Sequence, residues 1–277
     1  MPSQALPPLA SPTSSDRVRQ VVVTLAEVFC VIGTLVGVGL LGTRVEETAG
    51  GALSAEATRL APAGPAFSIW SVIYLGLAAY TVWQWLPSQT TTPRARATGW
   101  LVAASMVLNA AWLLVTQQGW LWVSVVVILA LVAVLGELVR RLTVTAAPAG
   151  GPARTVEAVV VDGTFGLYLG WVAVATCANV TAALIDSGVE PSAGVSDVAA
   201  VLVLLAVAGL GVFLAERLGG RYAVAGAAAW GLVWIAVGRT TSDPHSVATG
   251  VAAVTAAVVV VVATVLARAR TARPDPA

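Results

Sequence analysis

Eight long apolar stretches limit what this chain can fold into more than any other feature of its sequence. They cover roughly residues 21–42, 65–86, 99–117, 120–139, 158–185, 197–215, 222–238 and 247–267. A helix needs about 20 apolar residues to cross the hydrocarbon core of a bilayer, and backbone groups in lipid must be hydrogen-bonded internally. Runs of this length, without two-residue alternation, exclude a β-barrel. We therefore predict an all-α, polytopic integral membrane bundle with about eight transmembrane helices.

The composition agrees with a lipid environment and argues against several functions. Of the 277 residues, 58% are hydrophobic and only 10% are charged, whereas a soluble domain carries about a quarter charged residues. A net charge of +1 gives no basic face for nucleic acid. The metal and redox spacings CxxC and HExxH are missing from the sequence, and the single histidine, His245, lies beside a proline. We expect the lipid bilayer as the main partner, with no metal, no cofactor and no catalytic residues.

The arginines predict the orientation in the membrane. All fifteen basic residues are arginine. If the N-terminus is cytoplasmic, twelve of them lie inside, and only Arg44, Arg59 and Arg239 lie outside. Such an excess is the positive-inside pattern. It predicts an even number of crossings in a bacterial-type inner (plasma) membrane, with both termini in the cytoplasm.

The chain divides into four parts by composition. Residues 1–20 are rich in Pro and Ser and are expected to be a disordered tail. Residues 21–187 hold five of the apolar segments and eight of the ten tryptophans, and we expect a five-helix bundle there. Residues 190–268 are largely Ala, Val and Leu and are expected to add three more transmembrane helices, followed by a short tail at 269–277.

Polar and aromatic residues gather on one face of three predicted helices when the helices are drawn at about 100° per residue. The second segment contributes Phe67, Trp70 and Tyr74; the third contributes Ser105, Asn109, Trp112 and Thr116; the fifth contributes Tyr168, Trp171, Ala175 and Asn179. An unpartnered buried amide costs about 1–3 kcal/mol, so both asparagines should face protein or ligand. Two interpretations remain open, namely helix–helix packing with asparagine hydrogen bonds and the walls of a ligand pocket.

Two further features of the first segment can be interpreted. Gly33 and Gly37 form a small-xxx-small pair that predicts close helix packing. Glu27 is an acid well inside the segment, on a face with Thr24 and Thr34. Acids within the membrane are candidates for function, but snorkelling or pairing with an inner arginine would explain Glu27 equally well.

Three motifs resemble the tryptophan-rich sensory protein, or translocator protein, family (TspO/MBR). "AFSIWSVIYLGLAAYTVW" is similar to the F-x-x-x-W-x-x-x-Y of the family's second helix, although Phe67 lies one residue closer to Trp70 than in that pattern; "LNAAWLLV" is similar to its L-N-x-x-W, and "YLGWVAVATCAN" to its Y-L-x-W-x-x-x-A-T-x-x-N. The resemblance covers roughly residues 20–187. It implies a five-helix bundle that binds porphyrins, and in some members sterols, in a pocket capped by the loop between the first two helices. Carried over by position, the pocket residues would be Trp70, Tyr74, Asn109, Trp112, Tyr168, Trp171, Ala175 and Asn179.

The sequence departs from the family pattern at three places. The loop from Thr43 to Gly64 lacks aromatic residues, so the cap over the pocket is expected to be remodelled. Leu167 stands where the family has a proline, which puts a kink there in doubt. The family resemblance is expected to end near residue 187, and the three later helices could cover one side of the bundle, replace the partner in a homodimer, or add a second function.

These observations predict a membrane protein that binds a flat hydrophobic ligand, such as protoporphyrin or another tetrapyrrole or a sterol-like molecule, for sensing or transport. The expected ligand-binding residues are Phe67, Trp70, Tyr74, Ser105, Asn109, Trp112, Tyr168, Trp171, Ala175 and Asn179. The alternative is a proton- or solute-coupled secondary transporter with Glu27 as coupling residue, although no internal repeat or mid-helix proline supports it. Some family members degrade porphyrin in light, but no base–nucleophile pair indicates an enzyme here.

Overall fold

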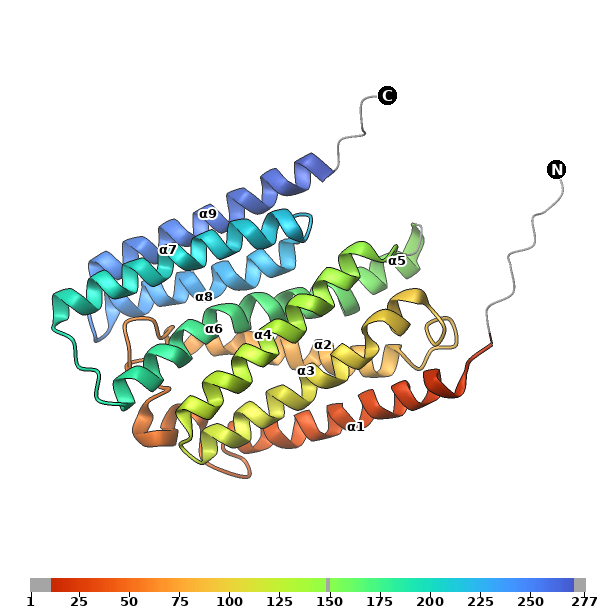
Figure 1. Cartoon of the computed structure of the whole chain (residues 1–277), viewed down its shortest axis with the longest axis horizontal. Coiled ribbons are helices and arrows are strands. Elements are labelled where there is room, and N and C mark those ends of the chain that lie inside the picture. The colour runs from red at the N-terminus through yellow and green to blue at the C-terminus, as the bar shows by residue number, and fades with distance from the viewer. Residues whose placement is uncertain (1–10, 148–149, 272–277) are drawn as a thin grey trace.

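The computed structural model describes residues 11–147 and 150–271, and all regular structure in these ranges is helical (Figure 1). The long helices are α1 (Ser14–Gly37), α2 (Ile69–Trp83), α3 (Pro93–Gln117), α4 (Leu121–Val144), α6 (Thr164–Asp186), α7 (Ala193–Arg217), α8 (Tyr222–Thr241) and α9 (Val247–Thr271). Short elements are the 3-10 helices η1 (Val45–Gly51) and η2 (Gly64–Ser68), the helix α5 (Gly151–Glu157) and the π-helix η3 (Ala158–Gly163). In the described part, eight helical spans are long and apolar enough to cross a membrane. The predicted polytopic membrane bundle is confirmed.

Several helices extend beyond the apolar stretches into polar sequence. α1 begins at Ser14, because Thr13 and Asp16 form a reciprocal capping box at its start. Residues 14–20 are therefore helical, which corrects the disordered tail expected for residues 1–20; residues 1–10 lie outside the described residues. α9 likewise continues to Thr271, into the expected C-terminal tail, of which residues 272–277 lie outside the described part.

The first helices pack in the order α1, α3, α4, α6 through close contacts. A Cβ atom added to Gly33 would lie 2.9 Å from the Cα atom of Ala110, so α1 and α3 approach each other closely at this point. The packing role expected for Gly33 and Gly37 is confirmed. The hairpin between α3 and α4 is very short. Gly119 makes it feasible, because its φ of 70° lies in the left-handed region that glycine adopts without strain.

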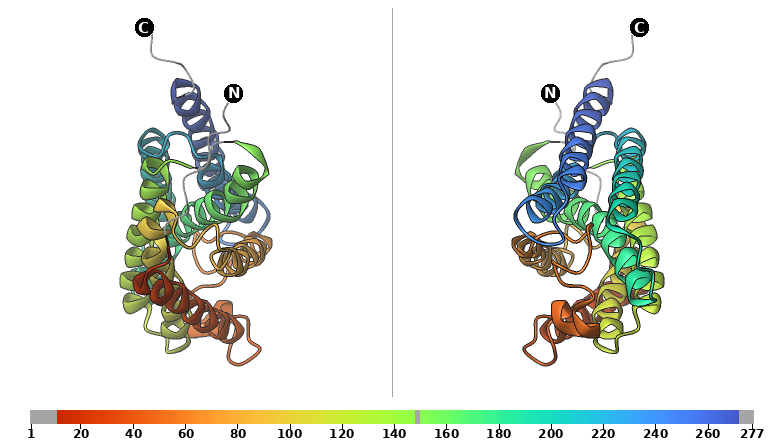
Figure 2. Two further views of the ribbon diagram at one scale, coloured as in Figure 1. Left: turned by 90° about the vertical axis from the view of Figure 1, so that its right-hand side faces the viewer. Right: turned by 90° about the vertical axis from the view of Figure 1, so that its left-hand side faces the viewer.

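The three C-terminal helices lie along one side of this bundle (Figures 1 and 2). α8 packs on α6, α9 packs on α8, and α7 packs on α9. Two glycines of α6 allow the close approach of α8, because a Cβ at Gly166 would lie 2.7 Å from the Cβ of Ala223 and one at Gly170 would overlap the carbonyl oxygen of Val224. Gly166 and Gly170 form the G-x-x-x-G spacing typical of close helix pairs in membranes, a signal present in the sequence that the helical wheels did not single out.

Candidate ligand cavity

A cavity of about 490 Å³ lies between α1, α2, α3 and the loop that follows α1. Its volume falls within the range of small-molecule sites, about 300–1,000 Å³. Its lining consists of Thr34, Gly37, Val38, Arg44, Val45, Glu46, Leu53, Phe67, Trp70, Ser71, Tyr74, Trp112 and Leu113. Four of the expected ligand-binding residues, all of them aromatic, are therefore brought together at one cavity.

The aromatic wall of the cavity comes mainly from α2. Trp70 and Tyr74 are four residues apart, so they share one face of the helix. Their ring centroids lie 5.2 Å apart with an angle of 15° between the planes, so the two rings stack on each other and leave only their outer faces and edges to the cavity. Trp112 of α3 and Phe67 of η2 complete the wall. Stacked and edge-on aromatic contacts favour flat, apolar molecules.

The aromatic residues of α6 stand one layer behind this wall. Trp70 contacts Tyr168 and Trp171 edge-on, with centroids 5.9 and 6.3 Å away, and Phe67 contacts Trp171 at 5.7 Å. Tyr168 and Trp171 are fully buried and do not line the cavity. We expected these two residues to contact the ligand directly. Instead, α6 lies behind α2, and its aromatic residues support the rings that face the cavity.

Asn109 and Ser105 of α3 also lie behind the cavity surface. The Asn109 amide donates a hydrogen bond to the Tyr74 hydroxyl at 3.2 Å and so holds that ring in place. The Ser105 hydroxyl donates to the carbonyl of Val102 in its own helix, while the Ser105 carbonyl accepts from Tyr168 at 3.3 Å. Both residues support the aromatic wall, and neither lines the cavity.

Asn179 joins three helices on the far side of Trp112. Its side-chain oxygen accepts a hydrogen bond from the Trp112 indole at 2.7 Å, and its amide nitrogen donates to Ser124 of α4 at 2.9 Å. Ala175, one turn earlier, is partly buried and packs against the main apolar core. Thr176 donates to the carbonyl of Val172, so its hydroxyl is satisfied within α6. Asn179 therefore positions the Trp112 ring, which lines the cavity, but Asn179 does not line the cavity itself.

We expect Asn179→Leu to destabilise the protein. Leucine has a similar size but leaves the Trp112 indole and the Ser124 hydroxyl without their shared partner. The loss should be about 1–2 kcal/mol, measured as a lower midpoint of thermal unfolding in detergent. Ser105→Ala is the control, because the Ser105 hydroxyl bonds only within its own helix. Equal midpoints for the two variants would contradict the bridging role of Asn179.

The loop after α1 roofs the cavity with residues that the helical patterns could not reveal. Arg44, Val45, Glu46 and Leu53 line the cavity from this side. Arg44 and Glu46 lie 3.6 Å apart as an ion pair, and both side chains are largely exposed. In the sequence Arg44 stood out only as one of the three outer arginines. The roof therefore places a cation and an anion above an aromatic wall.

Glu27 lies on the protein-facing side of α1, away from the cavity lining. It is only 7% exposed, and its Oε2 atom has no hydrogen-bond partner in the described chain. Among the described residues, no arginine comes within 4.0 Å of its carboxylate. Pairing with an inner arginine, one of the explanations that the sequence left open for Glu27, is therefore not found among the described residues.

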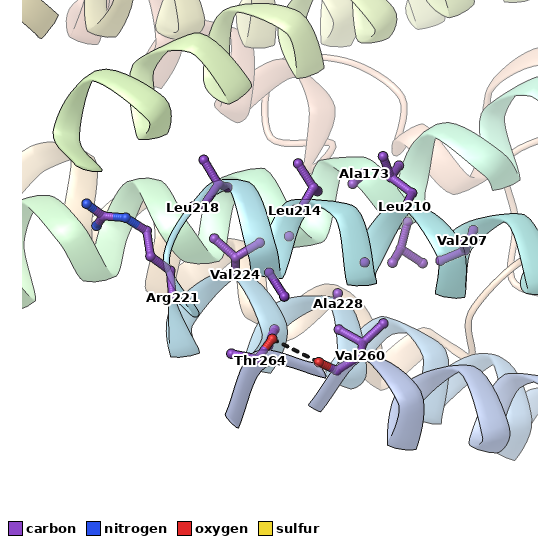
Figure 3. Close-up of a pocket in the computed structure, with 15 residues that line it drawn as sticks. Ala173, Val207, Leu210, Leu214, Leu218, Arg221, Val224, Ala228, Val260 and Thr264 are labelled. Carbon is purple, nitrogen blue, oxygen red and sulfur yellow. Dashed lines mark hydrogen bonds between the residues drawn. The ribbon is translucent and has the colours of Figure 1, made fainter. Parts of the chain in front are cut away.

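A second hollow lies between α6, α7, α8 and α9, with Arg221 at one end (Figure 3). Apart from Arg221 and Thr264, the side chains around it are aliphatic. Its volume of about 30 Å³ is far below the about 300–1,000 Å³ of small-molecule sites. It is too small for the predicted kind of ligand, and we treat it as a packing defect between helices.

A dense ionic network lies at the opposite end of the bundle from the cavity roof. Asp162, in the π-helix η3, accepts hydrogen bonds from Arg94 at 2.6 Å and from Arg154 and Arg221 at 2.9 Å each. Arg94 also pairs with Glu157. The network joins α3, the α5–η3 segment and the residue before α8. Both acids of this network, Asp162 and Glu157, have arginine partners, which indicates that the network stabilises the fold.

Fold and cavity together define a class: a multi-pass helical membrane protein, in contact with the lipid bilayer, with an aromatic-walled cavity beneath an extramembrane loop. A family model described as TSPO-like protein matches residues 22–266. The chain belongs to this TSPO-like family, and the resemblance to the TspO/MBR proteins is confirmed. The match continues through α7, α8 and α9, which corrects the expectation that it ends near residue 187. Searches of curated proteins and of solved structures gave no match.

Proposed function

We propose that this protein binds a flat hydrophobic ligand, a porphyrin or another tetrapyrrole or a sterol-like molecule, in the cavity between α1, α2 and α3. The observation that carries the proposal is the cavity of about 490 Å³ faced by Phe67, Trp70, Tyr74 and Trp112. These aromatic side chains suit a planar ring system, because ring faces and ring edges make favourable contacts with flat apolar molecules. Binding serves sensing or transport of the ligand and requires no catalytic group.

The roof of the cavity favours a ligand that carries carboxylates over a neutral sterol. Arg44 lies at the cavity mouth, and an arginine binds carboxylates through paired, charge-assisted hydrogen bonds. A porphyrin with acidic side chains could lay its ring on the aromatic wall and direct its carboxylates toward Arg44. Glu46, the present partner of Arg44, would then release it to the ligand.

The test is a titration of the purified protein with protoporphyrin and, separately, with a fluorescent sterol. We expect saturable binding of protoporphyrin by the wild type. Arg44→Gln should weaken porphyrin binding by about fivefold, the effect of losing one solvent-exposed charged contact, and should leave the affinity for the sterol unchanged. If Arg44→Gln changed the affinity for both ligands equally, Arg44 would not bind the porphyrin carboxylates. If neither ligand bound saturably, the proposed function would be wrong.

We further propose that the protein resides in a bacterial inner membrane with both termini in the cytoplasm. The distribution of arginines supports this orientation, since most lie at the end of the bundle that holds the Asp162 network. The cavity roof would then face the outside. The orientation can be tested by fusing to the C-terminus, in separate experiments, a reporter that is active only in the cytoplasm and one that is active only in the periplasm. Activity of the periplasmic reporter would contradict the proposed orientation.

A secondary transporter is a second candidate because Glu27 is a buried carboxyl without an arginine partner. Such acids in the membrane interior often carry protons. Proton-dependent solute uptake into vesicles that is lost in Glu27→Gln would favour this function. If Glu27→Gln did not affect uptake, Glu27 would not be the residue that couples transport to protons.

A further inference from the structure

The loop between α1 and α2 is attached to the C-terminal helices at several points. The indole of Trp230 in α8 donates a hydrogen bond to the carbonyl of Ala66 at 2.9 Å. The backbone amide of Ala63 donates to the carbonyl of Trp234, one turn further along α8, at 3.1 Å. Leu60 is 2% exposed and belongs to the apolar core formed mainly by α7, α8 and α9. The second half of the loop is therefore part of the packing of the C-terminal helices.

Arg239, near the end of α8, adds a polar attachment. It is only 1% exposed, and its guanidinium donates to the carbonyls of Ala55 at 2.9 Å and Pro244 at 3.1 Å. Among the described residues, no carboxylate lies within 4.0 Å of it. A buried cation whose partners are backbone carbonyls holds the chain that carries those carbonyls. Arg239 thus joins the α8–α9 turn to the loop over the cavity.

A third attachment comes from α7. Arg59 of the loop forms an ion pair with Asp197 at 2.6 Å, and the same carboxylate oxygen accepts a hydrogen bond from Ser246 at 2.6 Å. Ser246 directly precedes α9, so Asp197 connects the loop to the starts of both α7 and α9. The attachments come from α8 and α7, with Ser246 linking Asp197 to the start of α9, and all act on one loop segment, residues 55–66.

These attachments lie next to the residues that form the cavity. Ala66 immediately precedes Phe67, and Ala55 lies two residues after Leu53; Phe67 and Leu53 both line the cavity. We propose that α7, α8 and α9 act as a clamp that holds the cavity roof in place and thereby controls entry and exit of the ligand. The clamp itself is a property of the protein without ligand, whereas its effect on ligand exchange rests on the proposed function.

Hydrogen–deuterium exchange of the full-length, ligand-free protein tests the clamp. Trp230→Phe keeps an aromatic ring but removes the indole donor to Ala66 together with part of the ring system. Loss of one hydrogen bond, about 1 kcal/mol, should speed amide exchange across residues 53–67 by roughly fivefold. The matched control is Trp85→Phe, which removes a single indole hydrogen bond, to Thr24, from a similarly exposed tryptophan near the other end of the bundle. It should leave exchange of residues 53–67 unchanged.

Asp197→Asn provides a second variant that removes the charge of the attachment from α7 and so weakens it at a partly exposed side chain; it should fold normally. It should also speed exchange of residues 53–67, and in both clamp variants the dissociation rate of protoporphyrin should rise by a similar factor. Unchanged exchange in both variants would overturn the clamp. Faster exchange in a protein that does not bind protoporphyrin would support the clamp and remove only the proposed ligand.

Discussion

Replacing Asp162 by asparagine should destabilise the protein by about 2–4 kcal/mol. The carboxylate accepts hydrogen bonds from Arg94, Arg154 and Arg221, and its side chain is only 14% exposed. Removing one partner of a buried ion pair leaves an uncompensated charge, which costs about 3–5 kcal/mol for a fully buried pair. The lower range here allows for solvent around Arg154, which is 37% exposed. Asparagine would also direct amide protons toward cations.

Glu137→Gln is the matched control for this substitution. Glu137 also accepts from two arginines, Arg140 and Arg141, but all three lie on one turn of α4 and are exposed to solvent. Exposed pairs of this kind contribute little to stability. The midpoint of thermal unfolding should therefore fall clearly for Asp162→Asn and hardly change for Glu137→Gln. Similar midpoints would mean that the network around Asp162 is not a structural centre.

The second large effect is expected at Gly170, where α6 and α8 approach each other. A Cβ atom at this position would overlap the carbonyl oxygen of Val224, and it would lie 3.0 Å from the Cβ of Ala227. Because a helix backbone cannot move aside like a flexible side chain, Gly170→Ala must push the helices apart. Overpacking of this kind costs about 1–3 kcal/mol, and we expect a correspondingly lower unfolding midpoint in detergent.

Gly209→Ala serves as the control for Gly170→Ala. Gly209 lies in the middle of α7, and apart from its chain neighbours and the nearby backbone of its own helix no atom lies within 4 Å of the position that its Cβ would occupy. Alanine is the better helix former by about 1 kcal/mol, so this variant should be as stable as the wild type or more stable. If Gly170→Ala were equally harmless, α8 would not be seated on α6 as described.

The transmembrane architecture could be predicted from the sequence because the backbone of a chain in lipid must form all its hydrogen bonds internally, as it does in a helix. Apolar length predicted the spans, and their order along the chain predicted the bundle. The helix ends could not be found in this way. Residues such as Asp16 and Arg19 lower the hydropathy of the first turns of α1, yet they pair with each other at 2.8 Å and continue the helix beyond the apolar stretch.

Helical periodicity also predicted which residues gather around the cavity, but not their distance from it. Trp70 and Trp171 both lie on aromatic stripes, and a wheel cannot distinguish a residue that lines a cavity from one that packs behind it. That distinction depends on the placement of α6 behind α2. The roof residue Arg44 and the attachment at Arg239 lie in or near loops without periodicity, and their partners are determined by the three-dimensional fold.

The central claim, that this cavity is the ligand site, is tested most directly by filling it. Ser71 lines the cavity, and Ser71→Phe would place a ring in the space left for the ligand. Ser68→Phe makes the same change three residues earlier, at an exposed position outside the lining. In absorbance titrations with protoporphyrin, we predict wild-type affinity for Ser68→Phe and loss of saturable binding for Ser71→Phe, with equal unfolding midpoints. Wild-type affinity in folded Ser71→Phe would contradict the account.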